Sequence, residues 1–119
     1  MADGQLLVDL LHRDGAGVLV VRGEIDQASA PVFREAVERV EASGVPVVLD
    51  FAGVTYMDSS GLTVLIEASL RTGDAASVCV RNASEQVLRL LEITGLDSLI
   101  CAESQLPDVS TAHVSRSDR

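Results

Sequence analysis

The stretch from Val47 to Gly73, VVLDFAGVTYMDSSGLTVLIEASLRTG, decides the fold of this chain. Its first five residues, Val47 to Phe51, form a short apolar run rich in β-branched side chains, which is typical of a strand buried on both faces. From Leu62 onward the apolar positions recur at helical spacing instead. The face predicted for that helix consists of Leu62, Leu65, Ile66, Ser69 and Leu70. The stretch therefore predicts a buried strand followed directly by an amphipathic helix.

An acidic residue, two hydroxyls and a glycine separate the predicted strand from the predicted helix: Asp58, Ser59, Ser60 and Gly61. Asp and Ser can cap the free N–H groups of a first helical turn, and Gly allows another group to approach the backbone closely. A helix N-terminus carries about half a positive charge and attracts anions. The segment is therefore either a plain helix cap or a place where a hydroxyl meets a phosphate, bound or covalent.

Composition bounds the function classes. The chain has 119 residues, 47% of them hydrophobic, and a formal net charge of −9 with no Lys. This length suits one domain with a real core, and the acidity argues against a nucleic-acid partner, which would need a basic face. No apolar run approaches the ~20 residues of a membrane span, and no secretory signal is visible. We expect a cytoplasmic protein without a cofactor, a metal or a membrane partner.

Further elements flank the central stretch. Asp14-Gly15 connects two apolar runs, Leu6 to Leu11 and Val18 to Arg22, and predicts a β-hairpin. Ser29 is the expected cap of a helix that ends at Gly44.

After the central helix, Ser77 to Arg81 is the next predicted strand. Ser84 is expected to cap a third helix, which Gly95 closes in a Schellman end with Leu96 packing back. A last short strand is predicted from Leu99 to Cys101.

The element order β-β-α-β-α-β-α-β predicts an α/β fold with a mixed, mostly parallel sheet, an N-terminal hairpin and helices packed against it. We expect residues 1–105 to form the domain and residues 106–119 to be a polar, weakly structured segment. Right-handed crossovers would place Asp58 to Gly61 at the C-terminal end of the central strand, where open α/β sheets commonly carry function.

Two residue pairs leave alternatives open. Glu24 and Asp26 end the second predicted strand, and they indicate an exposed loop or, less simply, a metal or acid–base pair. Cys79 and Cys101 each lie in an apolar run without metal-ligand spacing. We expect both to be reduced and mostly buried, with a disulfide or redox switch as the alternative.

Four motifs together resemble a known family. They are Gly23-Glu24-Ile25-Asp26, Val48-Leu49-Asp50, Tyr56 to Leu62 and Leu90 to Leu96. In this order and spacing they are similar to the anti-sigma factor antagonists, the single-domain STAS proteins of bacteria. The resemblance covers roughly Leu6 to Cys101, and it departs from many members in having Thr63 where they have Gly.

The resemblance implies a STAS fold and a regulatory function without enzyme activity. Such antagonists bind an anti-sigma factor that is also a GHKL-type serine kinase, and binding frees the sigma factor for transcription. The kinase phosphorylates the residue that corresponds to Ser59, and the phosphorylated antagonist dissociates. A PP2C-type phosphatase then removes the phosphate. The resemblance implies a monomer or weak dimer. The partner-binding residues would be Glu24, Asp26, Asp58, Ser59, Ser60, Gly61 and Leu62.

Three other interpretations compete with this one. A phospho-aspartate receiver domain needs a Lys, which the chain lacks. A hydrolase with Ser59 or Ser60 as nucleophile needs a positioned base, and neither His12 nor His113 lies in a convincing strand-end loop. A STAS-type signalling adaptor that is not regulated by phosphorylation remains open, and only a partner assay separates it from the antagonist.

Overall fold

The computed structural model describes residues 5–72 and 77–102 of the 119-residue chain. The expected end of the central helix at Gly73 and the expected polar segment 106–119 lie outside the described residues. The described elements are β1 (Leu7–Arg13), β2 (Ala16–Ile25), α1 (Ala30–Ala42), β3 (Val47–Met57), α2 (Ser59–Thr72), β4 (Val78–Arg81), α3 (Glu85–Ile93) and the 3₁₀ helix η2 (Asp97–Leu99). No helix among them is long and apolar enough to cross a membrane.

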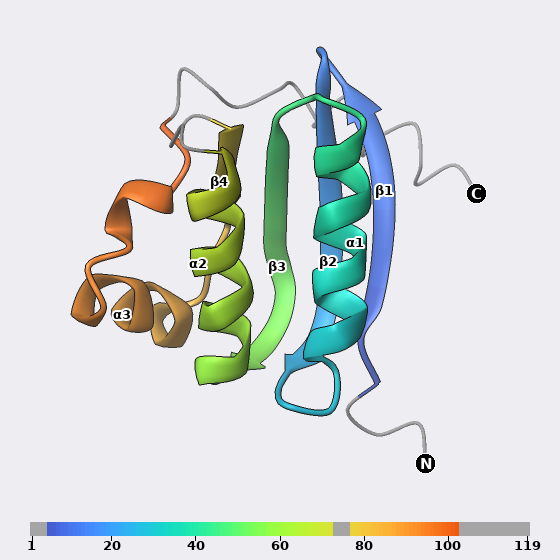
Figure 1. The fold of residues 1–119 in the computed structure, drawn as a ribbon. Helices are drawn as coiled ribbons and strands as arrows, with labels where there is room; N and C mark the ends of the chain where they lie inside the picture. Colours follow the sequence, from blue (N-terminus) through green and yellow to red (C-terminus); the bar gives the residue numbers. More distant parts are fainter. Residues whose placement is uncertain (1–4, 73–76, 103–119) are drawn as a thin grey trace.

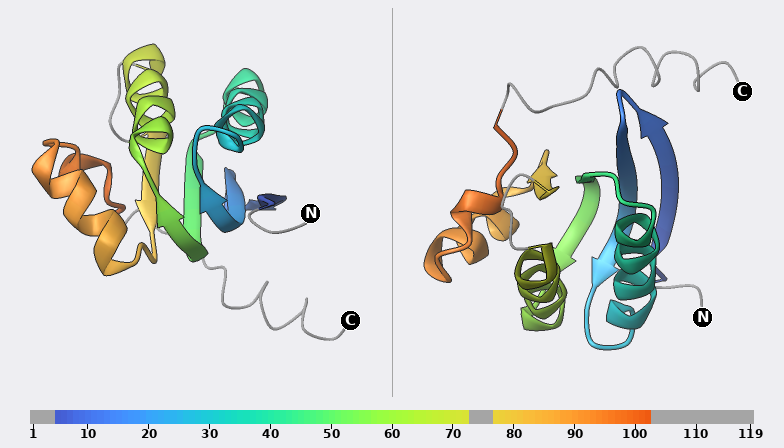
Figure 2. Two further views of the ribbon diagram at one scale, coloured as in Figure 1. Left: turned by 90° about the horizontal axis from the view of Figure 1, so that it is seen from below. Right: turned by 45° about the horizontal axis from the view of Figure 1, so that its top comes forward.

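The four strands form one mixed sheet in the order β1-β2-β3-β4. β1 pairs antiparallel with β2, whereas β2–β3 and β3–β4 are parallel. Figure 1 shows α1 and α2 in front of the sheet and α3 beside β4. The view from below in Figure 2 places α1 and α2 together on one side of the strands. The predicted mixed sheet with an N-terminal hairpin and packed helices is confirmed.

The hairpin turn has the backbone that its sequence predicts. Asp14 and Gly15 both have positive φ angles, 52° and 81°. A two-residue turn with both central φ angles positive matches the right-handed twist of the flanking strands, and Asp-Gly favours it. The turn sets the register in which Arg13 faces Ala16.

The main core lies between the sheet and the two helices in front of it. Phe33 of α1 and Phe51 of β3 are fully buried there, with ring centroids 5.9 Å apart. The face that α2 buries is only partly the predicted one. Leu62 and Leu65 are buried as predicted, but Val64 and Ala68 are fully buried while Ile66 and Leu70 are 39% and 76% exposed. The residues of α2 fit two overlapping series at helical spacing. The series that contains the small Ala68 faces the sheet, whereas Leu70 of the other series faces solvent.

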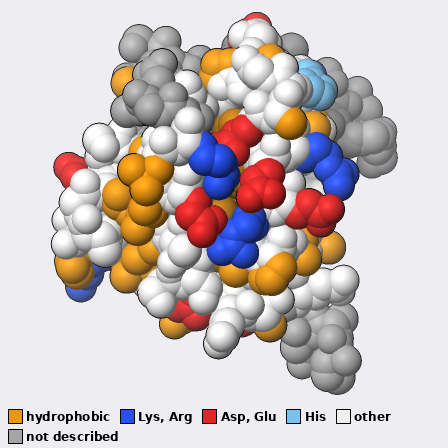
Figure 3. All heavy atoms as spheres, in the orientation of Figure 1, with side chains coloured by type: hydrophobic (Ala, Val, Ile, Leu, Met, Phe, Trp, Pro, Cys, Tyr) orange, Lys and Arg blue, Asp and Glu red, His pale blue; other side chains and the backbone are white. Residues whose placement is uncertain are grey.

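Ion pairs join the outer surfaces of α1 and α2. Arg34 Nε lies 2.9 Å from Glu67 Oε1, and Arg71 NH2 lies 2.9 Å from Glu41 Oε1. In Figure 3 acidic and basic side chains alternate across the middle of this face. A Glu35–Arg39 pair within α1 is also present, at 3.2 Å, with both side chains 73% exposed. Exposed pairs of this kind each contribute ~0–1 kcal/mol.

β3 is longer than the apolar run indicates. The sequence predicts a strand that ends at Phe51, but β3 continues to Met57 and pairs with β2 up to Ile25. Small and polar residues interrupt the apolar run after Phe51, yet Val54 and Met57 still turn inward and are buried. Because β3 continues beyond Phe51, α2 starts beside the C-terminal end of β2.

The third helix has both predicted ends. Ser84 Oγ accepts a hydrogen bond from Val87 N. At the other end Gly95 has a φ angle of 77°, Gly95 N donates to Glu92 O, and Leu96 N donates to Leu91 O, which is the Schellman pattern.

The predicted last strand from Leu99 to Cys101 is wrong. The chain forms η2 up to Leu99 and then meets β4 through a single parallel bridge between Ile100 and Val80. One hydrogen bond, from Cys101 N to Val80 O, holds this contact.

The prediction of two reduced cysteines is also wrong, because Cys79 and Cys101 form a disulfide. Cys79 is buried on the sheet face opposite α1 and α2, where it packs with Ala16, Val18 and Val48. The bridge to Val80 brings Cys101 beside it, with the two Cα atoms 4.8 Å apart. Because 22 residues separate the cysteines in sequence, only the return of the chain after η2 makes them neighbours.

Candidate functional site

The start of α2 is built by Asp58. Its Oδ1 accepts a hydrogen bond from Ser60 N at 2.8 Å, and its carbonyl oxygen accepts from Gly61 N at 3.1 Å. The Asp58 carboxylate therefore caps the first turn in the manner expected of an N-cap residue. The sequence left the cap among Asp58, Ser59 and Ser60, and the structure assigns it to Asp58.

Ser59 is the first residue of α2 and is exposed to solvent, whereas Ser60 is half-buried. Ser59 takes part in the helix through its backbone, since its carbonyl oxygen accepts a hydrogen bond from Thr63 Oγ1 at 3.0 Å. Thr63, the departure from the family pattern, thus reinforces the first turn. The Ser59 hydroxyl lies at the positive end of a 14-residue helix, where an added negative charge is favourable.

Gly61 lets the first turn of α2 pack directly on the strand ends. A Cβ atom at Gly61 would lie 2.5 Å from Met57 Cγ and 2.8 Å from Ile25 Cγ2. Both of those side chains are fully buried. Gly61 and Leu62 are themselves buried, so they support the helix start from below and present little side-chain surface.

Replacing Gly61 with Ala is therefore expected to destabilise the fold by about 1–3 kcal/mol, the usual cost of overpacking a filled core. Urea unfolding would measure the loss. Ser59→Ala is the matched control in the same turn, because the Ser59 side chain is exposed, and it should stay within about 0.5 kcal/mol of wild type. A Gly61→Ala protein as stable as wild type would contradict this prediction, because it would show that the first turn of α2 accommodates a methyl group without strain.

The Gly23 to Asp26 turn is held by Ser29. Ser29 Oγ donates to Glu24 O at 2.7 Å and accepts from Asp26 N at 3.0 Å, while Asp26 Oδ1 accepts from Ser29 N at 3.0 Å. Ser29 is the N-cap residue of α1, as predicted, but its side chain makes no cap hydrogen bond, because both its donor and its acceptor close the preceding loop. Glu24 is exposed and Asp26 is half-buried.

The two motifs meet at one edge of the sheet. Ile25 is in register with Met57, and Asp58 N donates to Ile25 O at 3.1 Å. The ends of β2 and β3 thereby bring Glu24 and Asp26 beside the helix start that carries Ser59. The acidic pair and the hydroxyl motif, 30 or more positions apart in the sequence, therefore lie at the same edge of the sheet.

A third contributor comes from α3. Gln86 bonds to both backbone groups of Met57: Met57 N donates to Gln86 Oε1 at 3.1 Å, and Gln86 Nε2 donates to Met57 O at 2.8 Å. Gln86 was not among the predicted site residues, because nothing in its local sequence pattern shows that it reaches a strand 29 residues away.

The described histidine, His12, lies far from this edge and cannot act as a base for Ser59 or Ser60. His12 lies in β1 and pairs with Gly17, which is in register with Val47 at the opposite end of β3. β3 has 11 residues, so the two ends lie about 30 Å apart at ~3.3 Å per residue. His113 lies outside the described residues. Within residues 5–72 and 77–102 no cluster of His, Cys, Asp and Glu could hold a metal ion.

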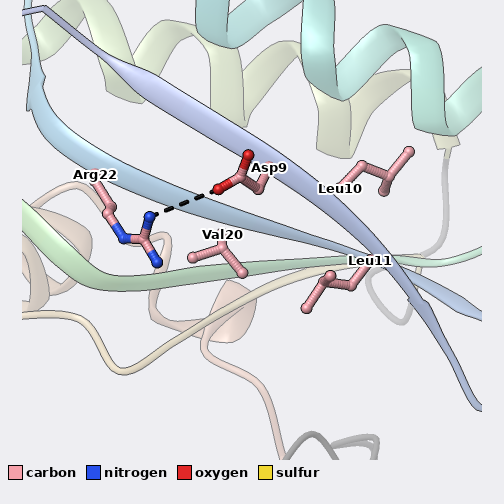
Figure 4. A pocket seen from close by; sticks show the side chains of 5 residues that line it. All are labelled: Asp9, Leu10, Leu11, Val20 and Arg22. Carbon is pink, nitrogen blue, oxygen red and sulfur yellow. Dashed lines mark ion pairs between the residues drawn. The ribbon is translucent and has the colours of Figure 1, made fainter. Parts of the chain in front are cut away.

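A hollow of about 210 Å³ lies on β1 and β2, away from this edge. Figure 4 shows its lining, with Asp9 Oδ2 and Arg22 NH1 3.6 Å apart beside Leu11 and Val20. Its opposite charges already neutralise one another, and both side chains are largely exposed. The hollow therefore lacks the buried, unpaired polar groups expected of a ligand-binding site.

The chain belongs to the STAS domain family, whose model matches residues 8–112. A curated relative from Bacillus subtilis (strain 168), named anti-sigma-B factor antagonist, is 34% identical over 94 residues, which cover 78% of this chain and 86% of the relative. The crystal structure of an anti-sigma factor antagonist from Mycobacterium paratuberculosis has a TM-score of 0.74 and 28% identity, covering 82% of this chain and 84% of that one. Unphosphorylated SpoIIAA shares the fold, with a TM-score of 0.65, 17% identity and coverage of 93% and 97%.

Proposed function

We propose that this protein is an anti-sigma factor antagonist that binds an anti-sigma factor with serine kinase activity, frees the sigma factor, and is switched off by phosphorylation of Ser59. The observation that carries the proposal is an exposed Ser59 at the start of α2, capped by Asp58 and bordered by the Glu24–Asp26 turn. Family membership supports the antagonist function, because the Bacillus subtilis relative is named an anti-sigma-B factor antagonist and the Mycobacterium paratuberculosis structure an anti-sigma factor antagonist.

The partner would contact the edge where β2 and β3 end. Its proposed contacts are Glu24, Asp26, Asp58, Ser59, Ser60, Gly61 and Leu62, the last two acting mainly by shaping the first turn of α2. The partner kinase would supply ATP, magnesium and the base, so the chain itself need offer only a hydroxyl. A PP2C-type phosphatase would remove the phosphate, and the antagonist would act in the cytoplasm as a monomer or weak dimer.

Phosphorylation would act through charge. A phosphoserine adds about −1.5 to −2 charges at pH 7. The N-terminus of α2 tolerates that charge, so the fold survives the modification. At the interface the new charge joins the nearby carboxylates of Glu24, Asp26 and Asp58, and it would have to lose its water against the partner, which favours release.

We expect one phosphoryl group per chain, on Ser59, after incubation with the cognate kinase and ATP. Intact mass would count the groups and peptide mapping would place them. Ser60→Ala is the matched control and should be modified like wild type, whereas Ser59→Ala should not be modified. Phosphate found only on Ser60 contradicts the assignment. Stable partner binding without any phosphate would favour a STAS-type adaptor that phosphorylation does not regulate.

A further inference from the structure

Both backbone groups of Met57 are hydrogen-bonded to one side chain, although β4 has already ended. β4 pairs with β3 only from Val47 to Asp50. Beyond that point Gln86 of α3 supplies an acceptor for Met57 N and a donor for Met57 O, at 3.1 and 2.8 Å. Backbone N–H and C=O groups need such partners when water is excluded. One amide side chain thus replaces the missing strand at the last residue of β3.

Gln86 is held in position because α3 is fixed at its N-cap and packs into the core at the residue after Gln86 and one turn further on. Ser84 caps the helix two residues earlier, and the next residue, Val87, is fully buried in the core. Leu91, one turn further on, is fully buried as well. The amide of Gln86 therefore reaches Met57 from an anchored helix.

Met57 in turn determines where Ser59 points. On the other side of the chain Asp58 N donates to Ile25 O at 3.1 Å, so two consecutive peptide groups are fixed by β2 and by α3. Asp58 then caps Ser60 N, and Ser59 lies between these fixed points. Any rotation of the Met57 peptide would turn the first residues of α2 with it.

We propose that Gln86 is a positioning residue of the switch: its two hydrogen bonds to Met57 hold the start of α2 in the orientation in which the kinase partner accepts Ser59. This inference rests on the proposed function and adds α3 to the site. It also defines a chemical requirement at position 86, namely one acceptor and one donor on the same planar group, which among side chains of this length only Gln provides.

Two near-isosteric variants separate positioning from general stability. Gln86→Met removes both hydrogen bonds at similar length. Gln86→Glu keeps an acceptor for Met57 N but places a carboxylate oxygen against Met57 O. Glu92→Gln is the matched control, because it changes an exposed residue of the same helix. Amide hydrogen exchange at Met57 measures the contact without any partner, phosphorylation kinetics measure its effect on Ser59, and thermal unfolding measures stability.

In Gln86→Met we expect Met57 exchange to accelerate about tenfold or more, because its acceptor is lost. Misplacement of a reacting group can cost up to about a hundredfold in rate, so kcat/KM for Ser59 should fall by about tenfold or more in both variants. Met57 exchange in Gln86→Glu should stay near wild type. Glu92→Gln should match wild type in every measurement. The two Gln86 variants should melt below wild type, because Met57 loses hydrogen-bond partners, but should remain folded at the temperature of the kinase assay.

Unchanged Met57 exchange in Gln86→Met would overturn the proposal, and so would wild-type phosphorylation of both variants. A drop in phosphorylation that only follows the unfolded fraction would also overturn it. A wild-type chain that no candidate kinase modifies would overturn the proposed function and with it the role of Gln86 in the switch. The exchange data would then still report whether Gln86 holds the end of β3, so the two failures can be told apart.

Discussion

Ser59→Asp is expected to weaken binding to the anti-sigma factor by roughly thirtyfold to several thousandfold while leaving the stability of the fold nearly unchanged. The side chain at this position is exposed, so folding does not strip water from the new carboxylate. At the N-terminus of α2 one negative charge contributes about 0.3–1 kcal/mol of favourable interaction. At an interface an unmatched charge costs about 2–5 kcal/mol, which corresponds to that loss of affinity.

Binding titrations and thermal unfolding on matched variants decide this prediction. In Ser59→Asn the new side chain has nearly the size of the Asp side chain but carries no charge. Ser59→Ala removes the hydroxyl. If charge drives release, the Asp variant should bind much more weakly than the Asn variant, and all three should melt close to wild type. Equal losses for Asn and Asp would assign the effect to bulk. A binding loss that only follows a large drop in melting temperature would make the switch a folding effect.

Breaking the Cys79–Cys101 disulfide is expected to destabilise the fold by about 3 kcal/mol. The bond closes a segment of 22 residues, and the chain-entropy estimate for a loop of that length is about 3 kcal/mol. For a domain of this size the loss corresponds to a drop in melting temperature on the order of 10 °C. The closed segment contains α3, so reduction should also raise amide exchange in that helix more than in α1.

Thermal unfolding with and without a dithiol reductant would measure the contribution of the disulfide in the unmodified sequence. Cys101→Ser is the control, since it leaves the buried Cys79 in place and should melt equally with and without reductant. It should also melt close to reduced wild type. Wild-type protein that melts at the same temperature in both conditions would contradict the prediction.

Local signals in the sequence were sufficient for several turns and helix ends. The positive φ angles at Asp14 and Gly15 and the Schellman end at Gly95 follow from turn chemistry over a few residues. The same holds for the helix start at Ser59, because a capping carboxylate directly precedes it. These features fixed the α/β order and placed the hydroxyl motif at a strand end.

Contacts between distant segments could not be predicted in this way. The face that α2 buries depends on which of two equally spaced series meets the sheet, and Ala68 gave no signal as strong as Leu70. The pairing of Cys79 with Cys101 depends on the turn after η2. Gln86 reaches Met57 because of where α3 packs. The spacing of apolar residues along the sequence does not predict this packing position.

The division of tasks between Asp58 and Ser59 has an evolutionary consequence. Asp58 supplies the helix cap, so the cap does not depend on the neighbouring hydroxyl. If Ser59 is the regulated residue, as proposed, a single codon change at position 59 would remove or restore regulation in a lineage without a penalty in foldability. Descendants of one ancestral domain could diverge into switchable and constitutive versions by neutral steps, with the scaffold unaltered throughout.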